Sequence, residues 1–361
     1  MFSRNRILAL FITSFSLVWL AGFSGVAAQL IPQNPPSKSG TPLPTATPPI
    51  IEDDEVIKID SDVVNVLFTA QDRNRRLLTT LSQQDIKIIE NGQVQEIQAF
   101  SKQIDLPLSL AILIDVSVSQ QRTLPEEKAA ATSFLETVIR PAKDEVAIVS
   151  FTGETTLEQG MTNNLTRLRR AIERVQFVPP SGYIGGGVIA GTPPISGDNQ
   201  AIQGSTAIWD AIWVTSDEVL GPAPERTRRA IILLSDGVNT FGKKDLDDAV
   251  QAALRSEAII YSIGIGDNFY SGVDKGSLNK ISERTGGRAY FPRDERELRD
   301  AFKQIQDEMR SQYLIAYEPT NQNRDGSYRK IEIQMVNPQL VKEKIKVTHR
   351  QGYFARTDTK K

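Results

Sequence analysis

The sequence contains no cysteine and a single histidine, His349. The lack of cysteine excludes disulfides, thiolate metal ligands, cysteine nucleophiles and lipid attachment through cysteine. A single histidine excludes metal sites built from several histidines and leaves a Ser-His-Asp enzyme only one base, which argues against that class. Any metal site must therefore be made of oxygen ligands, and these favour hard cations such as Mg²⁺ or Ca²⁺.

The sequence also lacks an excess of charge of either sign. It has 42 Lys and Arg residues against 44 Asp and Glu residues, a formal net charge of −2. Bulk electrostatics therefore do not indicate a nucleic-acid partner. A length of 361 residues predicts one to three domains, and an apolar content of 40% allows ample core for a soluble globular protein.

The N-terminal segment is typical of an export signal. Arg4 and Arg6 precede an apolar stretch over 7–20, and small residues at 26–28 offer a cleavage site. The apolar stretch is shorter than the roughly 20 residues that a membrane span needs. We therefore predict a signal peptide over 1–28 and a periplasmic, cell-surface or secreted location. The alternative is an uncleaved membrane anchor over 7–28.

A linker and two β-rich flanks are expected around the central part of the chain. Residues 29–54 are rich in Pro, Ser and Thr and predict an extended linker. Residues 55–104 contain apolar runs on both sides of Asn91-Gly92, which is a strong hairpin signal. Residues 312–356 return to alternating apolar and polar positions, with strands expected over 313–317, 330–336, 343–347 and 352–355. We predict that the two flanks pair into one small β-sandwich.

Between the flanks, residues 105–311 alternate between strand-like and helix-like patterns. Strands are expected over 108–114, 145–151, 229–234, 259–265 and 289–291, and helices over 125–139, 165–175, 207–218, 245–256, 276–283 and 295–311. Strands that alternate with helices predict an α/β fold with a doubly wound, mostly parallel sheet flanked by helices.

Oxygen-bearing side chains gather in loops that follow or precede these elements. A near-continuous apolar run over 108–114 predicts a strand buried on both faces, and the chain then places an acid and two hydroxyls at alternate positions. The candidate site residues in these loops are Asp115, Ser117, Ser119, Thr206 and Asp236. Each has an ordinary explanation alone, because Ser and Thr cap helices and Asp-Gly makes turns. Together they form an all-oxygen set of low charge, at the sheet edge where ligands bind in open α/β folds.

Such a set suits Mg²⁺, which keeps several waters and is rarely enclosed by protein ligands alone. Two carboxylates, partly acting through water, leave the ion under-neutralised. An outside carboxylate is therefore expected to complete the coordination, and this provides a mechanism for binding a partner.

These motifs resemble the metal-ion-dependent adhesion site of von Willebrand factor type A (VWFA) domains. The resemblance covers residues 106–311 and rests on Asp115-x-Ser117-x-Ser119, on Thr206 within GSTAIWDAI and on Asp236 within LLSDG. It implies a Rossmann-like sheet with one antiparallel edge strand. It further implies that Ser117, Ser119 and Thr206 ligate Mg²⁺ (or Mn²⁺) directly, that Asp115 and Asp236 hold waters, and that a partner protein supplies a Glu or Asp.

The match departs from the family pattern at Val118, where many members have glycine, although no ligand is lost. The flanks are similar to a bacterial exported subgroup of VWFA proteins. The Gly- and Pro-rich stretch 179–203 precedes Thr206 and is expected either to rim the site or to be a simple insertion. Asp144 is expected in a turn, Asp267 in tight turn geometry, and His349 in a structural or exposed place on a β-strand.

The leading hypothesis is thus an exported, non-enzymatic adhesion module that binds a partner protein through a metal-bridged carboxylate. Two alternatives stay open. One is a Mg²⁺-dependent hydrolase that acts on phosphate esters at the same site. The other is a structural module in which the ion only stabilises the loops and the β-rich flanks bind the partner.

Overall fold

The computed structural model describes residues 62–102, 105–177, 183–184, 187–188, 205–224, 226–266 and 272–357. All of them belong to one compact unit, Ile59–Lys361. The predicted export signal over 1–28, the linker over 29–54 and Asp267 lie outside these residues. Of the stretch 179–203, the described part is a short hairpin of β8 (Tyr183–Ile184) and β9 (Gly187–Val188).

A six-stranded sheet forms the centre of the α/β part, with the strand order β12-β11-β10-β5-β6-β7. Every neighbouring pair is parallel except β6 and β7, which are antiparallel. Its strands are β5 (Leu108–Asp115), β6 (Glu145–Phe151), β7 (Thr155–Thr162), β10 (Arg228–Ser235), β11 (Ala258–Gly264) and β12 (Ala289–Tyr290). The chain thus places one antiparallel strand at the edge of a parallel sheet.

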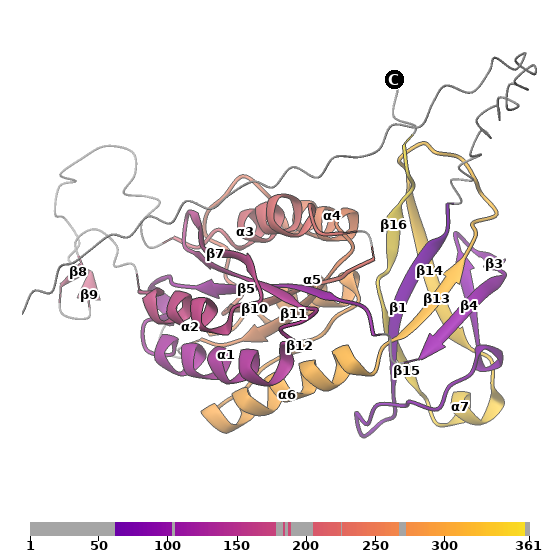
Figure 1. Cartoon of the computed structure of the whole chain (residues 1–361), viewed down its shortest axis with the longest axis horizontal. Coiled ribbons are helices and arrows are strands. Elements are labelled where there is room, and N and C mark those ends of the chain that lie inside the picture. The colour runs from indigo at the N-terminus through magenta and orange to yellow at the C-terminus, as the bar shows by residue number, and fades with distance from the viewer. Residues whose placement is uncertain are drawn as a thin grey trace, which may run out of the picture. The chain divides into compact units, whose positions relative to one another are not determined.

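Helices cover both faces of this sheet (Figure 1). One face packs against α1 (Leu124–Val138), α2 (Leu165–Arg174) and α6 (Glu295–Arg310). The other packs against α3 (Ile208–Val214), which continues into the π-helical turn η4 (Thr215–Leu220), and against α4 (Leu246–Arg255) and α5 (Lys275–Thr285). All eight residues of β5 are buried because its alternate side chains enter two separate cores. The predicted α/β fold class is confirmed.

The segments before and after the α/β part form two antiparallel four-stranded sheets. One has the order β15-β1-β13-β4 and the other β16-β14-β2-β3. Their strands are β1 (Val64–Gln71), β2 (Ile86–Glu90), β3 (Gln93–Gln95), β4 (Ile97–Lys102), β13 (Tyr313–Tyr317), β14 (Tyr328–Met335), β15 (Lys346–His349) and β16 (Gly352–Phe354). A short helical turn, η1 (Gln83–Asp85), precedes β2.

Side chains of both sheets fill one shared core, in which Phe68 stacks on Tyr313 with ring centroids 5.0 Å apart. In the turn between β2 and β3, Asn91 and Gly92 have φ values of 46° and 86°. These positive values are the ones that the Asn-Gly hairpin signal predicts.

One predicted strand of the C-terminal flank is misplaced. The expected strand over 343–347 is preceded by a short helix, α7 (Pro338–Lys342), and β15 begins only at Lys346. Asn337 caps the helix by accepting a hydrogen bond from the Gln339 backbone N–H at 3.0 Å, and proline fits the first helical position. Lys344 has a φ of 53°, a left-handed conformation that interrupts an extended strand.

His349 lies on β15, and its imidazole contacts backbone atoms of the β-rich part. Its Nε2 accepts a hydrogen bond from the Ile333 N–H at 3.2 Å, and its Nδ1 lies 2.7 Å from the Arg350 carbonyl oxygen. Burial lowers the pKa of His349 below its ordinary value. Within the described residues, no helix has the length and apolar character needed to cross a bilayer.

Candidate metal centre

The carboxylate of Asp115 ends the central strand β5 and is fully buried. Its Oδ1 accepts a hydrogen bond from the Ser117 backbone N–H at 3.0 Å. Its Oδ2 accepts one from the Ser235 hydroxyl, at the end of the neighbouring strand β10, at 2.7 Å. Both oxygens are thus held in fixed directions by the ends of two adjacent parallel strands.

The hydroxyls of Ser117 and Ser119 follow directly, and their Oγ atoms lie 3.2 Å apart. The short helical turn η2 (Val118–Gln120) brings them together, since the Gln120 N–H donates to the Ser117 carbonyl oxygen at 3.0 Å. Gln120 is itself fully buried, and its Nε2 donates to the Ile265 carbonyl oxygen, just after β11, at 3.0 Å. This side chain fastens the serine loop across the sheet edge.

Asp236 follows β10 and faces the serine loop. It shares a side-chain hydrogen bond with Ser119, and its Oδ1 accepts the Val238 N–H at 2.9 Å. Gly237 has a φ of 81°, and a Cβ at this position would lie 2.7 Å from Leu278 Cγ. Glycine after Asp236 is therefore required both by the backbone conformation and by the packing of α5.

Thr206 precedes α3 and is held at the same edge by its backbone. Its N–H donates to the Thr240 hydroxyl at 2.9 Å, and its carbonyl oxygen accepts the Thr240 N–H, also at 2.9 Å. The next residue, Ala207, donates its N–H to the carbonyl oxygen of Thr152, just after β6, at 2.7 Å. The loops after β6 and β10 thus position this threonine, which is 5% exposed.

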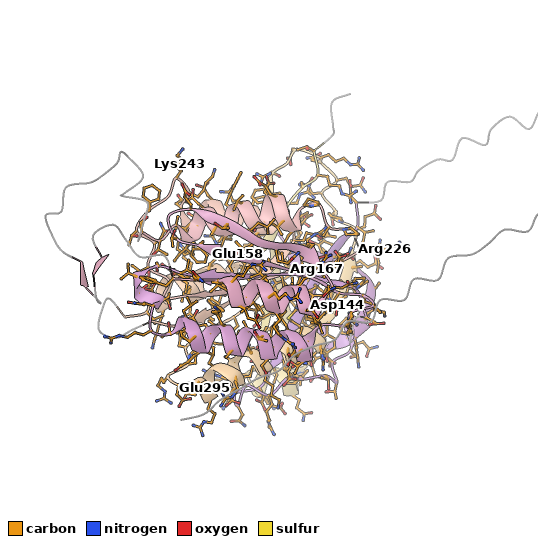
Figure 2. All side chains as sticks on the ribbon, turned by 60° about the vertical axis from the view of Figure 1, so that its left-hand side comes forward. Asp144, Glu158, Arg167, Arg226, Lys243 and Glu295 are labelled. Atoms are coloured by element: carbon orange, nitrogen blue, oxygen red, sulfur yellow. The ribbon has the colours of Figure 1, made fainter. Side chains whose placement is uncertain are left out.

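The site lies at the end of the strands opposite to that of Asp144. Figure 2 shows Lys243, in the loop after β10, on the left, and Asp144 and Arg226, which precede β6 and β10, on the right. Asp144 is buried and accepts hydrogen bonds from the Leu108 N–H at 3.0 Å and from Arg140, so it serves the fold at that other end.

The candidate site contains two acids, Asp115 and Asp236, whose negative charge is not balanced by a basic side chain in the ligand set. Burial, and to a smaller degree the nearby charge of Asp236, raise the pKa of Asp115 to about 7. Burial also raises the pKa of Asp236. Two buried carboxylates with raised pKa values, lined by neutral hydroxyls, fit a divalent cation, because a cation would favour the charged form of both.

The donor chemistry limits the ion that fits. Over the described ranges, no group of three or more His, Cys, Asp or Glu residues is arranged to hold a metal ion. The candidate set differs, because it combines two carboxylates with the hydroxyls of Ser117, Ser119 and Thr206. Such oxygen ligands suit hard cations that retain part of their water shell.

Two family models, each described as von Willebrand factor type A domain, match residues 110–239 and 195–304. The two ranges overlap and together run from β5 to α6. This part of the chain is a von Willebrand factor type A domain. No curated protein matches the chain.

Solved structures similar to the chain include two bacterial proteins that it covers over their full length. The conserved hypothetical protein BatB from Bacteroides thetaiotaomicron is 18% identical over 56% of this chain and 100% of that chain, with a TM-score of 0.42. An aerotolerance-related membrane protein from Bacteroides fragilis NCTC 9343 is 17% identical over 56% of this chain and 100% of that chain, with a TM-score of 0.41.

A third similar structure is proximal thread matrix protein 1 from the mussel byssus. It is 17% identical over 61% of this chain and 51% of that chain, with a TM-score of 0.45. Another crystal structure of that mussel protein, 16% identical with a TM-score of 0.41 over 58% of this chain and 49% of that chain, has a zinc-occupied metal-ion-dependent adhesion site.

The structure joins four of the five sequence-predicted residues of the type A domain by direct interactions. Asp115, Ser117, Ser119 and Asp236 are linked by side-chain hydrogen bonds and charge, whereas Thr206 is fixed at the same edge through backbone contacts. Whether they bind a metal stays a prediction.

Sequence reasoning missed three buried residues at this edge: Gln120, Ser235 and Glu127. Ser235 lies within the LLSDG motif, so the sequence allowed its position at the strand end to be predicted. Glu127 falls on the apolar face of the predicted helix, four residues before Ala131, and this spacing was a signal that a buried acid lies there.

Proposed function

We propose that this protein is an exported, non-enzymatic binding module whose type A domain holds Mg²⁺ (or Mn²⁺) and through it binds a carboxylate of a partner protein. Ser117, Ser119 and Thr206 would contact the ion, and Asp115 and Asp236 would hold its waters. The observation that carries the proposal is the pair of buried acids at a hydroxyl-lined sheet edge: burial raises the pKa of both, and the charge of Asp236 also raises that of Asp115. The bound ion would supply an open coordination position for an outside oxygen.

The match to the type A domain models supports a protein-interaction role for the chain. Export rests on the sequence pattern of residues 1–28. The lack of a hydrolytic function rests on the site chemistry, because the strongest charge acting on Asp115 comes from another acid and not from a basic residue suited to a leaving group.

Two measurements test the proposal. Calorimetric titration of the protein with MgCl₂ is expected to show binding that Asp115→Ala and Thr206→Ala both abolish. A displayed peptide library, bound in Mg²⁺ and eluted with chelator, is expected to yield peptides with an essential Glu or Asp. Absence of Mg²⁺ and Mn²⁺ binding in the parent, or peptides whose acids are replaceable by amides without effect, would contradict the proposal. Turnover of a generic phosphoester that Asp115→Ala removes would favour the hydrolase instead.

A further inference from the structure

Glu127 occupies a position of α1 where an apolar residue is expected. The buried face of this helix consists of Leu124, Glu127, Ala130, Ala131, Phe134, Leu135 and Val138. Glu127 is fully buried, and neither of its carboxylate oxygens has a hydrogen-bond partner. An acid buried in this way destabilises a fold unless something compensates its charge, so its presence requires an explanation.

The surroundings of Glu127 point towards the candidate metal centre. Burial is the largest cause that raises the pKa of Glu127 to about 8; the Thr123 side chain acts in the opposite direction, and the charges of Asp115 and Asp236 raise the pKa as well. The chain reaches α1 directly from the serine loop, where the Gln120 Oε1 accepts the Thr123 hydroxyl at 3.0 Å. The buried acid of α1 therefore responds to both acids of the candidate metal centre.

The position of Glu127 in the first turn of α1 explains only part of how its negative charge is tolerated. The exposed backbone N–H groups of a helix N-terminus favour a nearby carboxylate. Exposed Glu126 shares that turn, so the helix end alone does not explain why its neighbour is an acid that is fully buried. A cation held by Asp115 and Asp236 would compensate it.

We propose that Glu127 is a third acid of the metal centre, placed behind the five ligand residues, and that its charge raises the affinity of the site for a divalent cation. The inference rests on the proposed function and extends it. Glu127 is a positioning residue and not a ligand, since the described residues include no group of three acids arranged to hold a metal ion directly. Its effect reaches the ion through the low dielectric of the buried site.

One consequence concerns the order of binding. The two acids of the ligand set balance a divalent ion only if both are ionised, and Glu127, whose ionised form a bound cation favours, adds a third negative charge from within the chain. The ion is then retained without a partner. The partner's carboxylate is recruited by the open coordination position and not by a deficit of negative charge.

The test is calorimetric titration of the full chain with MgCl₂, comparing the parent with Glu127→Gln and with the matched control Glu126→Gln. The same substitution in the next residue, which is exposed, corrects for a general change of net charge. We expect the dissociation constant of Glu127→Gln to rise about tenfold, which is the factor that one modest charge interaction produces, and that of Glu126→Gln to stay within about twofold. In chelator above about pH 8, Glu127→Gln is expected to melt at a higher temperature than the parent, because a buried acid that would be ionised there is removed.

The outcomes separate this inference from the proposed function. If the parent binds Mg²⁺ and Glu127→Gln binds it equally well, the inference is wrong while the proposed function stands. If the parent binds neither Mg²⁺ nor Mn²⁺, both are wrong. A second variant, Glu127→Leu, fits the apolar face of α1 and is expected to weaken binding to the same degree, so a folding defect peculiar to the glutamine variant would be recognised.

Discussion

Replacing Asp115 by asparagine is expected to stabilise the protein in chelator and to remove its stabilisation by Mg²⁺. The side chain is fully buried, and its pKa is raised to about 7 by burial and by the charge of Asp236. The fold therefore prefers the neutral form of this group. Asparagine mimics that neutral form but cannot balance the charge of a cation.

The size of the effect follows from the pKa. A shift from 3.8 to about 7 corresponds to about 4 kcal/mol of lost stability once the pH is well above 7, at 1.36 kcal/mol per unit. Asparagine keeps one acceptor oxygen, so one of the two hydrogen bonds, from Ser117 or Ser235, is lost at a cost of about 1 kcal/mol. The net gain in chelator is about 3 kcal/mol, or a rise in Tm of roughly 4–5 °C for a protein of this size, at about 2.1 cal/mol/K of unfolding entropy per residue.

The sign of the pH dependence follows from the direction of the shift. The pKa of Asp115 is higher in the folded state than in the unfolded state. At any pH between these two pKa values, the folded state therefore binds more protons. Stability in chelator should therefore fall as the pH rises from about 4 to about 7, and the advantage of Asp115→Asn should open across that window.

Urea denaturation in EDTA and in 10 mM MgCl₂, over about pH 4 to 8, measures these differences. The matched control is Asp144→Asn at the opposite end of the strands. Arg140 donates hydrogen bonds to the Asp144 carboxylate there, and these bonds lower the pKa of Asp144. That variant should be less stable than the parent in both buffers. If Asp115→Asn is less stable than the parent in EDTA at pH 8, the reasoning about the buried charge is refuted.

Three further predictions concern other residues. Thr206→Val removes only the hydroxyl and should weaken Mg²⁺ binding at least about tenfold by calorimetry, while stability in chelator changes by less than about 1 kcal/mol because the backbone holds this residue. Gly237→Ala should lower the unfolding free energy in urea by about 2 kcal/mol or more, since its Cβ would lie 2.7 Å from Leu278 Cγ; an unchanged midpoint would contradict this. His349→Gln should flatten the loss of stability below about pH 6.5, because burial lowers the pKa of the folded-state imidazole and the unfolded state binds more protons there.

The parallel sheet and the edge that carries the candidate site were predictable from local pattern. The apolar run over 108–114 matches β5, and the expected strand over 145–151 coincides with β6. Buried parallel strands have no polar face, so their sequences are recognisable without knowledge of their neighbours. Alternate positions after β5 then place Ser117 and Ser119 together, as their Oγ separation of 3.2 Å shows.

Two elements were less readable for physical reasons. The edge strand β7, with the sequence TTLEQGMT, is only partly buried and carries no clear alternation, so the residues themselves gave no strand signal. The C-terminal strand β15 was placed three residues too early, because α7 and the left-handed Lys344 separate it from the preceding strand. Capping by Asn337-Pro338 was the available signal.

The sequence by itself determined the fold class, the all-oxygen character of the site and the sheet edge at which it lies, because period, turn chemistry and residue type are local properties. Only the tertiary structure decided the electrostatics. The pKa of Asp115 depends on its burial and on Asp236, which is far away in sequence, and the raised pKa of Glu127 depends on its burial in α1 and on the charges of both aspartates. Charge interactions depend on the distance between the groups and on their burial, and neither can be deduced from the spacing of residues along the chain.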